Sequence, residues 1–217
     1  MEVRTILLNK SVYEDPAAEA EALRTYLRDK GVYLVNVMSS PGAGKTTTLI
    51  ALIDRLKSRY RIGVMEADID SDVDAIKVAE KTGVRSVQLH TGGMCHLDAA
   101  MTKQGLDELG AEDLDLVFLE NVGNLVCPAE YYTGAHLNMT ILSVPEGDDK
   151  PLKYPLMYET CSLVVVNKID TLPYFDFSLE RMRAHLPKKD VTVIPLSAKT
   201  GEKMEDLENY FITILRK

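Results

Sequence analysis

Short continuous apolar runs alternate along the chain with longer stretches in which apolar residues recur every three or four positions. The first pattern is typical of strands buried on both faces of a sheet, and the second is typical of helices with one buried side. Strands are predicted at 32–38, 61–67, 84–89, 114–120, 139–144, 162–168 and 190–196. Helices are predicted at 15–31, 45–60, 71–83, 97–109 and 202–217. The alternation predicts an α/β fold with a mostly parallel central sheet and helices on both faces.

The length of 217 residues suits one domain that can fold without disulfides. No internal repeat, low-complexity segment or long linker divides the chain. Residues 1–217 are therefore expected to form a single domain, with about 1–31 as a helical extension ahead of the first predicted strand.

The formal net charge of −8 argues against a surface dedicated to nucleic acid or to acidic membranes. The first residues contain no long apolar run, and no stretch approaches the roughly 20 apolar residues that span a bilayer. We therefore expect a cytoplasmic protein whose three cysteines are free thiols or metal ligands.

The stretch "SSPGAGKTT" lies between a predicted strand and a predicted helix, which is the context of a phosphate-binding loop. Gly42 and Gly44 would let backbone amides approach phosphates at the helix N-terminus. Lys45 would reach the β- and γ-phosphates, and the Thr46 hydroxyl would bind Mg²⁺. The usual pattern G-x-x-x-x-G-K-[ST] begins with glycine, whereas this chain has Ser39. The chain is therefore predicted to be a P-loop NTPase.

The stretch "VVVNKID" places Asn167, Lys168 and Asp170 at the end of another predicted strand. The Asp170 carboxylate can accept hydrogen bonds from N1–H and the 2-amino group of guanine, a donor pair that adenine lacks. The Lys168 stem can cover the face of the base. The later "LSAK" (196–199) would offer a backbone amide, here that of Ala198, to guanine O6. These stretches predict a guanine nucleotide as the ligand.

Acidic residues follow two more predicted strands. Glu120, in "LVFLENVG", can hold Mg²⁺, and the Gly123 amide can sense the γ-phosphate. Asp68, in "EADIDSDVD", is expected to face Mg²⁺ or the attacking water. The latter stretch starts like a calcium loop but has Val73 where glycine is needed and Ala79 where the bidentate glutamate belongs. Purely structural roles are the alternatives: Glu120 as a carboxylate at a strand end, and Gly123 as a turn glycine.

The remaining acids of this stretch have different expected roles. Glu66 receives no role. Asp70, Asp72 and Asp74 are expected to cap and solvate the next helix.

The stretch "HTGGMCHLDAAM" contains adjacent Cys95 and His96 after a Gly-Gly turn. Such neighbours can share one metal only from a loop or a helix start, because their side chains diverge on regular elements. Cys127 follows Gly123 by four residues. Two thiolates and one imidazole suit Zn²⁺, or Ni²⁺ with open positions. A catalytic Cys–His pair and packed small hydrophobes are the alternatives.

The other cysteine and histidines are expected to be structural. Cys161 is predicted to be packed in the core, and His90 and His136 are predicted to be structural or peripheral.

Together, "SSPGAGKTT", "EADIDSD", "TGGMCHLDA", "ENVGNLVCPAE", "NKID" and "SAK" resemble the HypB family, from about residue 32 onward. The resemblance implies a GTPase of the dimer-forming E-x-x-G branch that assists nickel insertion during [NiFe] hydrogenase maturation. It implies a homodimer, a HypA-type partner and a hydrogenase large-subunit precursor as recipient. Some members carry an N-terminal cysteine-rich site or a histidine-rich tract; no cysteine precedes Cys95 here and the sequence has four histidines, so neither a high-affinity N-terminal site nor a nickel-storage role is expected.

Three other functions are weighed against this one. Urease accessory GTPases resemble the chain too, but they carry Cys-Pro-His where this chain has Cys95-His96-Leu-Asp. A small-molecule kinase using ATP would leave Asp170 and the S-A-K loop unexplained. A metal carrier that binds nucleotide without hydrolysing it is the third alternative.

These arguments yield a specific set of site residues. Residues predicted to bind GTP or GDP are Gly42, Ala43, Gly44, Lys45, Thr46, Thr47, Gly123, Asn167, Lys168, Asp170, Ser197, Ala198 and Lys199. Lys45, Asp68 and Glu120 are predicted to be catalytic. Mg²⁺ is assigned to Thr46, Asp68 and Glu120, and Ni²⁺ or Zn²⁺ to Cys95, His96 and Cys127.

Overall fold

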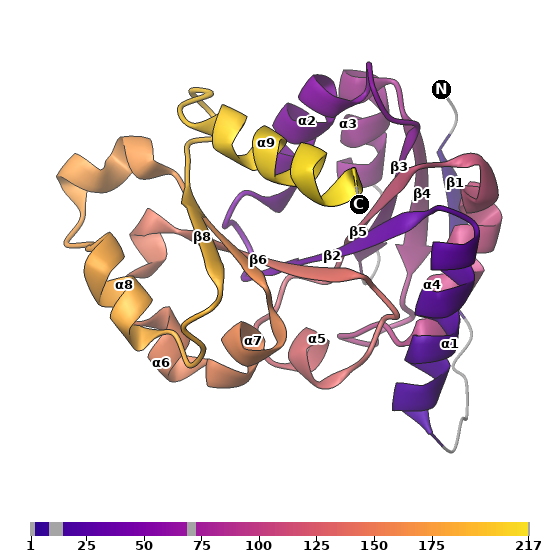
Figure 1. Cartoon of the computed structure of the whole chain (residues 1–217), viewed down its shortest axis with the longest axis horizontal. Helices are drawn as coiled ribbons and strands as arrows, with labels where there is room; N and C mark the ends of the chain where they lie inside the picture. Colours follow the sequence, from indigo (N-terminus) through magenta and orange to yellow (C-terminus); the bar gives the residue numbers. More distant parts are fainter. Residues whose placement is uncertain (1–2, 9–14, 69–72, 217) are drawn as a thin grey trace.

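The computed structural model describes residues 3–8, 15–68 and 73–216, which form one eight-stranded sheet with helices on both faces (Figure 1). The strands are β1 (Arg4–Leu7), β2 (Tyr33–Ser39), β3 (Ile62–Asp68), β4 (Arg85–His90), β5 (Leu116–Glu120), β6 (Leu137–Ser143), β7 (Leu163–Asn167) and β8 (Thr192–Pro195). All of these strands pair in parallel, in the order β1-β4-β3-β5-β2-β6-β7-β8. The predicted α/β fold with a mostly parallel sheet is confirmed.

The interior strand β2 is where the chain changes direction across the sheet. β5, β3, β4 and β1 lie on one side of β2, and β6, β7 and β8 lie on the other. In a parallel sheet, such a switch point opens a crevice at the carboxyl ends of the strands. Ser39, Asp68, Glu120 and Asn167 are the last residues of β2, β3, β5 and β7. The topology therefore brings the predicted phosphate, magnesium and base residues to one edge of the sheet.

One face of the sheet carries α2 (Lys45–Leu56), α3 (Val73–Thr82) and α9 (Met204–Leu215), which lie above the strands in Figure 1. Their apolar sides share one core with β2, β3, β5, β6 and β7. In this core, Phe118 packs edge-on against Phe211 at a centroid distance of 5.5 Å. The burial of α2 holds the helix start at Lys45 against the end of β2.

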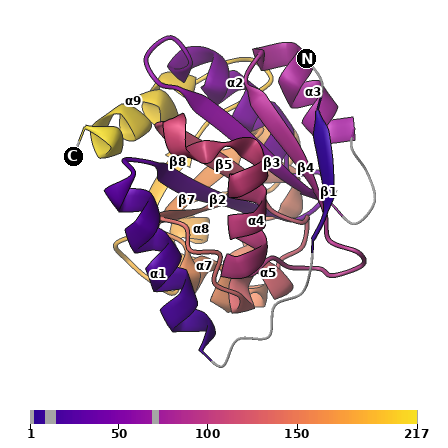
Figure 2. The same ribbon diagram turned by 90° about the vertical axis from the view of Figure 1, so that its right-hand side faces the viewer.

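The opposite face carries two groups of helices. α1 (Pro16–Asp29) and α4 (Ala99–Leu109) lie side by side and share a core with β2 to β5 (Figure 2). The second group contains α5 (Cys127–Glu130), α7 (Pro155–Thr160) and α8 (Leu179–His185) over β6 and β7, with α6 (Lys150–Lys153) against α7 and α8. Short 3₁₀ helices occur at Ala111–Asp113, Val144–Glu146 and Ile169–Tyr174. Within the described ranges, no helix has the length and apolar character needed to cross a membrane.

The structure contains elements that the apolar pattern does not predict. β1 pairs with β4 at the edge of the sheet, so the N-terminal segment contains a strand as well as the expected helix. Three of the four β1 residues are exposed, and such an edge strand has no continuous apolar run. The helices α5 to α8 have between four and seven residues, which is too short for a clear helical period.

Three asparagines form a polar ladder through the apolar sheet. Asn121 Nδ2 donates to Asn36 Oδ1 at 3.0 Å, and Asn36 Nδ2 donates to Asn138 Oδ1 at 3.1 Å. Asn138 Nδ2 in turn donates to the Thr160 carbonyl at 3.1 Å. Asn121 Oδ1 accepts from the Val122 amide at 2.9 Å. The ladder ties the segment after β5 to β2 and β6.

Candidate functional site

The predicted phosphate loop (39–46) runs from the last residue of β2 into the first turn of α2. Gly44 has a φ of +98°, and a Cβ atom at this position would lie 2.5 Å from Asn167 Nδ2, so glycine is required there. Lys45 Nζ donates to Ser39 Oγ at 3.1 Å across the loop. The glycine turn and the helix start present backbone amides and a favourable dipole to an anion.

A cavity of about 580 Å³ opens beside this loop, and we call it the phosphate cavity. Among the predicted site residues that line it are Gly42, Gly44, Lys45, Thr46, Thr47, Asp68, Glu120, Gly123 and Lys168. Ala43 is instead fully buried, and its carbonyl oxygen accepts from Asn167 Nδ2 at 3.0 Å. The structure thus brings the predicted phosphate and magnesium residues together around one space.

Two buried glutamates lie side by side at the floor of this cavity. Glu66 on β3 and Glu120 on β5 are register partners, with 3% and 4% of their surfaces exposed. Glu120 Oε1 accepts from Thr46 Oγ1 at 2.9 Å. Within the described ranges, Glu120 Oε2 and Glu66 Oε1 have no hydrogen-bond partner. Burial raises the pKa of both carboxyl groups, and the neighbouring Glu120 helps to raise that of Glu66 well above its usual range.

The donor set fits the predicted magnesium site. Mg²⁺ prefers oxygen ligands. Glu120 offers the unpartnered Oε2, and its other oxygen, Oε1, accepts from the Thr46 hydroxyl. Asp68, the exposed last residue of β3, lies on the wall of the same cavity. The sequence pattern assigns no role to Glu66, although a glutamate inside the apolar run 61–67 is itself a signal of a buried acid with a role at the site.

The other acids that follow β3 are only partly described. Asp70 and Asp72 lie outside the described residues. Asp74 is in the first turn of α3, as expected for a residue that favours a helix N-terminus. Asp74 also lines the phosphate cavity, together with Lys77.

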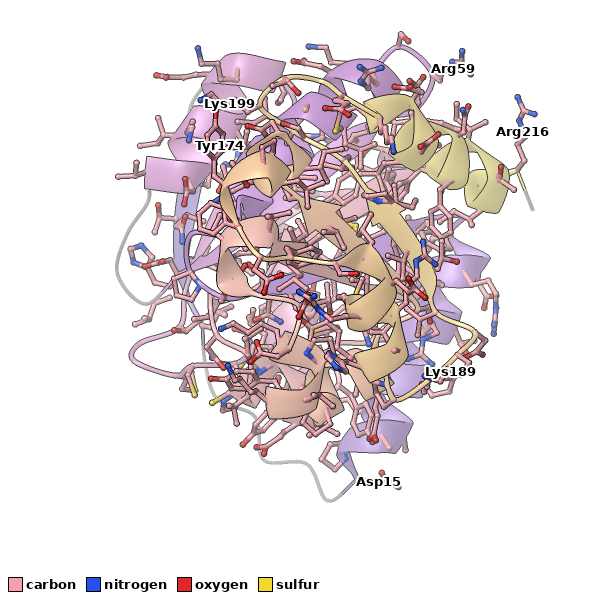
Figure 3. All side chains as sticks on the ribbon, turned by 90° about the vertical axis from the view of Figure 1, so that its left-hand side faces the viewer. Asp15, Arg59, Tyr174, Lys189, Lys199 and Arg216 are labelled. Carbon is pink, nitrogen blue, oxygen red and sulfur yellow. The ribbon has the colours of Figure 1, made fainter. Side chains whose placement is uncertain are left out.

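A second pocket of about 360 Å³ adjoins the phosphate cavity, and we call it the base pocket. Its walls include the predicted Asn167, Lys168, Asp170, Ala198 and Lys199, and it shares Gly44, Thr47 and Lys168 with the phosphate cavity. Asp170 Oδ1 is buried and has no hydrogen-bond partner in the described part of the chain. Lys199 lies at the opposite end of the molecule from Asp15, the N-cap of α1 (Figure 3).

Asn167 joins the loops that surround the base pocket. Its Nδ2 donates to the Ala43 carbonyl, and its Oδ1 accepts from the amides of Lys168 and Ala198 at 2.8 and 3.1 Å. The Ala198 amide, which we expected to reach guanine O6, donates to Asn167 in this structure. Ser197 is fully buried, and its Oγ accepts from the Thr200 amide at 3.2 Å. Asn167 and Ser197 therefore shape the pocket from behind.

Lys168 spans the two cavities. Its φ of +62° is uncommon for a residue with a side chain, and its Nζ donates to the Gly42 carbonyl at 2.7 Å. The aliphatic stem of Lys168 therefore crosses from the base pocket to the phosphate loop, as expected for a residue that covers a base.

Cys95, in the loop before α4, meets Cys127, the first residue of α5, with their Sγ atoms 2.6 Å apart. Each is partly exposed, and the Cys95 thiol raises the pKa of the Cys127 thiol. The His96 ring instead stacks on Tyr131, at a centroid distance of 3.5 Å and an interplanar angle of 11°. Nowhere in 3–8, 15–68 or 73–216 do three Cys, His, Asp or Glu side chains converge as a metal-binding group. The structure thus brings together two of the three predicted nickel or zinc ligands.

The remaining cysteine and histidine assignments concern packing. Cys161 is 1% exposed in the core beneath α7 and α8, as predicted, and burial raises its pKa to about 11. His136 stacks on Tyr33, and its Nδ1 accepts from the Leu34 amide at 3.1 Å. His90 is the last residue of β4.

Comparison with known proteins places the chain in a family. Residues 33–193 match the model of the family described as "CobW/HypB/UreG, nucleotide-binding domain". The chain is 41% identical over 204 residues to the hydrogenase maturation factor HypB of Rhizobium leguminosarum bv. viciae, covering 93% of this chain and 68% of that protein. It is 40% identical over 208 residues to the hydrogenase/urease maturation factor HypB of Helicobacter hepaticus, covering 94% and 84%.

A solved structure agrees with these sequence matches. The crystal structure of HypB from Helicobacter pylori in complex with nickel superposes with a TM-score of 0.85 at 37% identity, covering 93% of this chain and 95% of that chain. The family match covers β2, β3, β5 and β7, which carry the phosphate loop, the glutamate pair and the base residues at 167–170. The chain belongs to the CobW/HypB/UreG family of nucleotide-binding domains and, within it, to the HypB hydrogenase maturation factors.

Proposed function

We propose that the chain is a GTP-hydrolysing metallochaperone that binds nickel or zinc and assists nickel insertion during [NiFe] hydrogenase maturation. One observation carries the proposal. A single segment (120–127) begins at the buried Glu120 of the phosphate cavity and ends at Cys127 of the thiol pair. Nucleotide and metal would therefore act on the same short piece of backbone. We call residues 120–127 the switch segment.

The phosphate cavity would hold the triphosphate of GTP. Lys45 would leave Ser39 to neutralise the β- and γ-phosphates, and the amides of the phosphate loop would donate to them. Thr46, Asp68 and Glu120 would hold Mg²⁺, which supplies charge neutralisation at the phosphates. The unpartnered Glu120 Oε2 supports this assignment.

The base pocket would recognise guanine. The unpartnered Asp170 Oδ1 is an acceptor placed in the pocket wall, and guanine offers N1–H and a 2-amino group to a carboxylate. Adenine would leave the carboxylate unpaired, which disfavours ATP strongly. The same observation disfavours a small-molecule kinase that uses ATP.

Hydrolysis would be slow because the machinery is incomplete in one chain. None of the described residues that line the phosphate cavity is an arginine. The position after Gly123 holds Asn124, whose side chain donates to the Cys95 carbonyl and accepts from the Cys127 amide. In-line attack by water would then depend on positioning and charge neutralisation, as in unassisted G proteins. We expect a turnover within a decade or two of roughly 10⁻³ s⁻¹.

Cys95 and Cys127 would bind the metal as thiolates, and His96 would join them after its ring leaves Tyr131. Three protein ligands leave a position open for water, a partner or a second copy of the chain. We propose a homodimer that passes nickel, with a HypA-type partner, to the hydrogenase large-subunit precursor. The Helicobacter hepaticus relative is named as a hydrogenase/urease maturation factor, so delivery toward urease is the second candidate function.

Phosphate release from purified protein tests the hydrolytic part of the proposal. GTP should release phosphate slowly, and excess ATP should not compete. Lys45→Ala should abolish the release, since it removes the cation that the phosphates need. Lys189→Ala is the matched control, because Lys189 lies on a surface remote from Lys199, where its Nζ donates to the carbonyls of Ala184 and Leu186 (Figure 3). Equal phosphate release in Lys45→Ala and wild type would reject enzymatic hydrolysis.

A further inference from the structure

The Asn124 side chain bridges the loop that carries Cys95 and the start of α5, which carries Cys127. Its Nδ2 donates to the Cys95 carbonyl at 2.8 Å, across 29 residues of sequence. Its Oδ1 accepts from the amides of Val126 and Cys127, each at 2.9 Å. One amide group therefore holds the backbone of both cysteines at once, at the place where their Sγ atoms lie 2.6 Å apart.

The bonds to Val126 and Cys127 also shape the start of α5. No side chain at the N-cap position, Val126, caps this helix. Asn124 Oδ1 instead satisfies the Cys127 amide, which opens the helix, so it orients the first residue of α5. A displacement of Asn124 would therefore move the backbone from which the Cys127 thiol projects.

On its other side, Asn124 adjoins the phosphate loop through Gly123. A Cβ atom at Gly123 would lie 3.4 Å from Lys45 Nζ and 3.5 Å from Pro41 Cα, so the glycine packs directly on that loop. The Asn124 amide donates to the Val122 carbonyl at 2.8 Å and closes a tight turn over Gly123. Because the turn is tight, a displacement of the Gly123 backbone would also displace Asn124.

The hydrogen bonds of Asn124 also bear on the role that a G protein gives to the residue after the switch glycine. Orienting the attacking water requires a free acceptor. Asn124 Oδ1 already accepts two N–H groups, which uses both of its lone pairs. The Asn124 side chain is therefore placed to hold the backbone of Cys95 and Cys127, and not to orient the attacking water.

We propose that Asn124 is the positioning residue that transmits the nucleotide state to the thiol pair. The inference rests on the proposed function, because it needs both a bound guanine nucleotide and a metal held by Cys95 and Cys127. GTP would reorder Gly123, and Asn124 would then change the relative placement of the two thiolates. By reciprocity, metal bound to the thiolates would change nucleotide affinity by the same factor.

Two substitutions separate the two halves of the bridge. Asn124→Asp keeps an acceptor for the Val126 and Cys127 amides but loses the donor to the Cys95 carbonyl. Asn124→Ala loses both halves. Asn209→Asp makes the same chemical change on the exposed surface of α9 and is the matched control. A retained thermal transition and retained GDP binding establish that each variant is folded.

The test is a titration of the full chain with Ni²⁺, with GDP and with a non-hydrolysable GTP analogue. The near-ultraviolet thiolate-to-nickel charge-transfer band reports binding by the cysteines. In wild type and in Asn209→Asp, the nickel affinity with GDP and the nickel affinity with the GTP analogue should differ by about fivefold or more, which is the lower end of ordinary allosteric coupling. In Asn124→Asp, the ratio should fall to within about twofold of unity, although nickel still binds.

Each outcome decides one idea. A ratio in Asn124→Asp equal to that of wild type would overturn the role of Asn124 and leave the proposed function intact. If Asn124→Ala does not fold, Asn124→Asp alone decides. Equal nickel affinities with the two nucleotides in wild type would overturn the coupling in the proposed function itself, and the role of Asn124 with it.

Discussion

Asp170 carries a buried oxygen that has no hydrogen-bond partner in the described ranges. A buried acceptor left unpaired costs roughly 1–3 kcal/mol, so such an atom in a pocket wall indicates a missing donor. At the residue scale, this is the most specific support for guanine, because it identifies an acceptor placed for two donors.

Asp170→Asn should change which base is bound. The amide can no longer accept from both guanine donors, and two hydrogen bonds to a charged group contribute about 1.5–3 kcal/mol each. GTP affinity should fall about a hundredfold or more. Xanthine carries a carbonyl where guanine has its 2-amino group, so xanthosine triphosphate should bind Asp170→Asn better than wild type. Competition against a fluorescent nucleotide measures both changes.

Asp190→Asn is the control for this exchange, since Asp190 is exposed and lines neither the phosphate cavity nor the base pocket. Unchanged GTP affinity in Asp170→Asn would show that the carboxylate does not read the base.

At the residue scale, the sequence predicts some contacts better than others. Lys45 and Thr46 are predictable because strand, glycine turn and helix are consecutive in the chain. The contact of Glu66 with Glu120 depends on the register of β3 against β5, which spacing alone does not give. The stacking of His96 on Tyr131 depends on the path of two loops, which the adjacency of His96 to Cys95 in the sequence does not give.

The asparagine ladder is the feature that matters most at the scale of elements. Asn36 is 1% exposed in the middle of β2. It is hydrogen-bonded to Asn121, which directly follows β5, and to Asn138 on β6. Buried polar groups in such a network are stabilising only while every member is satisfied. The ladder therefore fixes the start of the switch segment against the centre of the sheet.

Asn36→Ala should destabilise the nucleotide-free protein. It leaves Asn121 Nδ2 and Asn138 Oδ1 without their partner, at about 1–3 kcal/mol for each group that water cannot reach. Urea unfolding measures the loss of free energy. Asn209→Ala on the exposed side of α9 should change stability by no more than about 0.5 kcal/mol. Equal midpoints for Asn36→Ala and Asn209→Ala would show that the ladder does not hold the sheet.

Elements with strong periodicity are predicted well, and others are not. The buried strands β2 to β8 and the helices α1, α2, α3, α4 and α9 correspond to predicted segments, although their ends shift by a few residues. β1 escapes prediction because tertiary pairing with β4 forms it, not an apolar run. The short α5 escapes because Asn124 and Pro128 define its start locally.

At the scale of the whole molecule, the parallel sheet gathers distant motifs at one edge. The phosphate loop, the glutamate pair and the base residues all lie at or near the carboxyl ends of strands, as the switch-point rule requires. The thiol pair joins this edge through the switch segment, which leaves β5 at Glu120 and reaches α5 at Cys127. The order of motifs in the sequence predicts that the nucleotide-binding residues gather at this edge. The Asn124 bridge between Cys95 and Cys127 is visible only in the structure.

In the proposed function, one chain links the binding of guanine nucleotide to the binding of metal. The most direct test is the nickel affinity of wild-type protein, measured by competition with a chromophoric chelator, in the GDP-bound form and in the form bound to a non-hydrolysable GTP analogue. We expect affinities that differ by about fivefold or more, with the difference lost in Cys127→Ala. Equal affinities in the two nucleotide forms of the wild-type protein would contradict it.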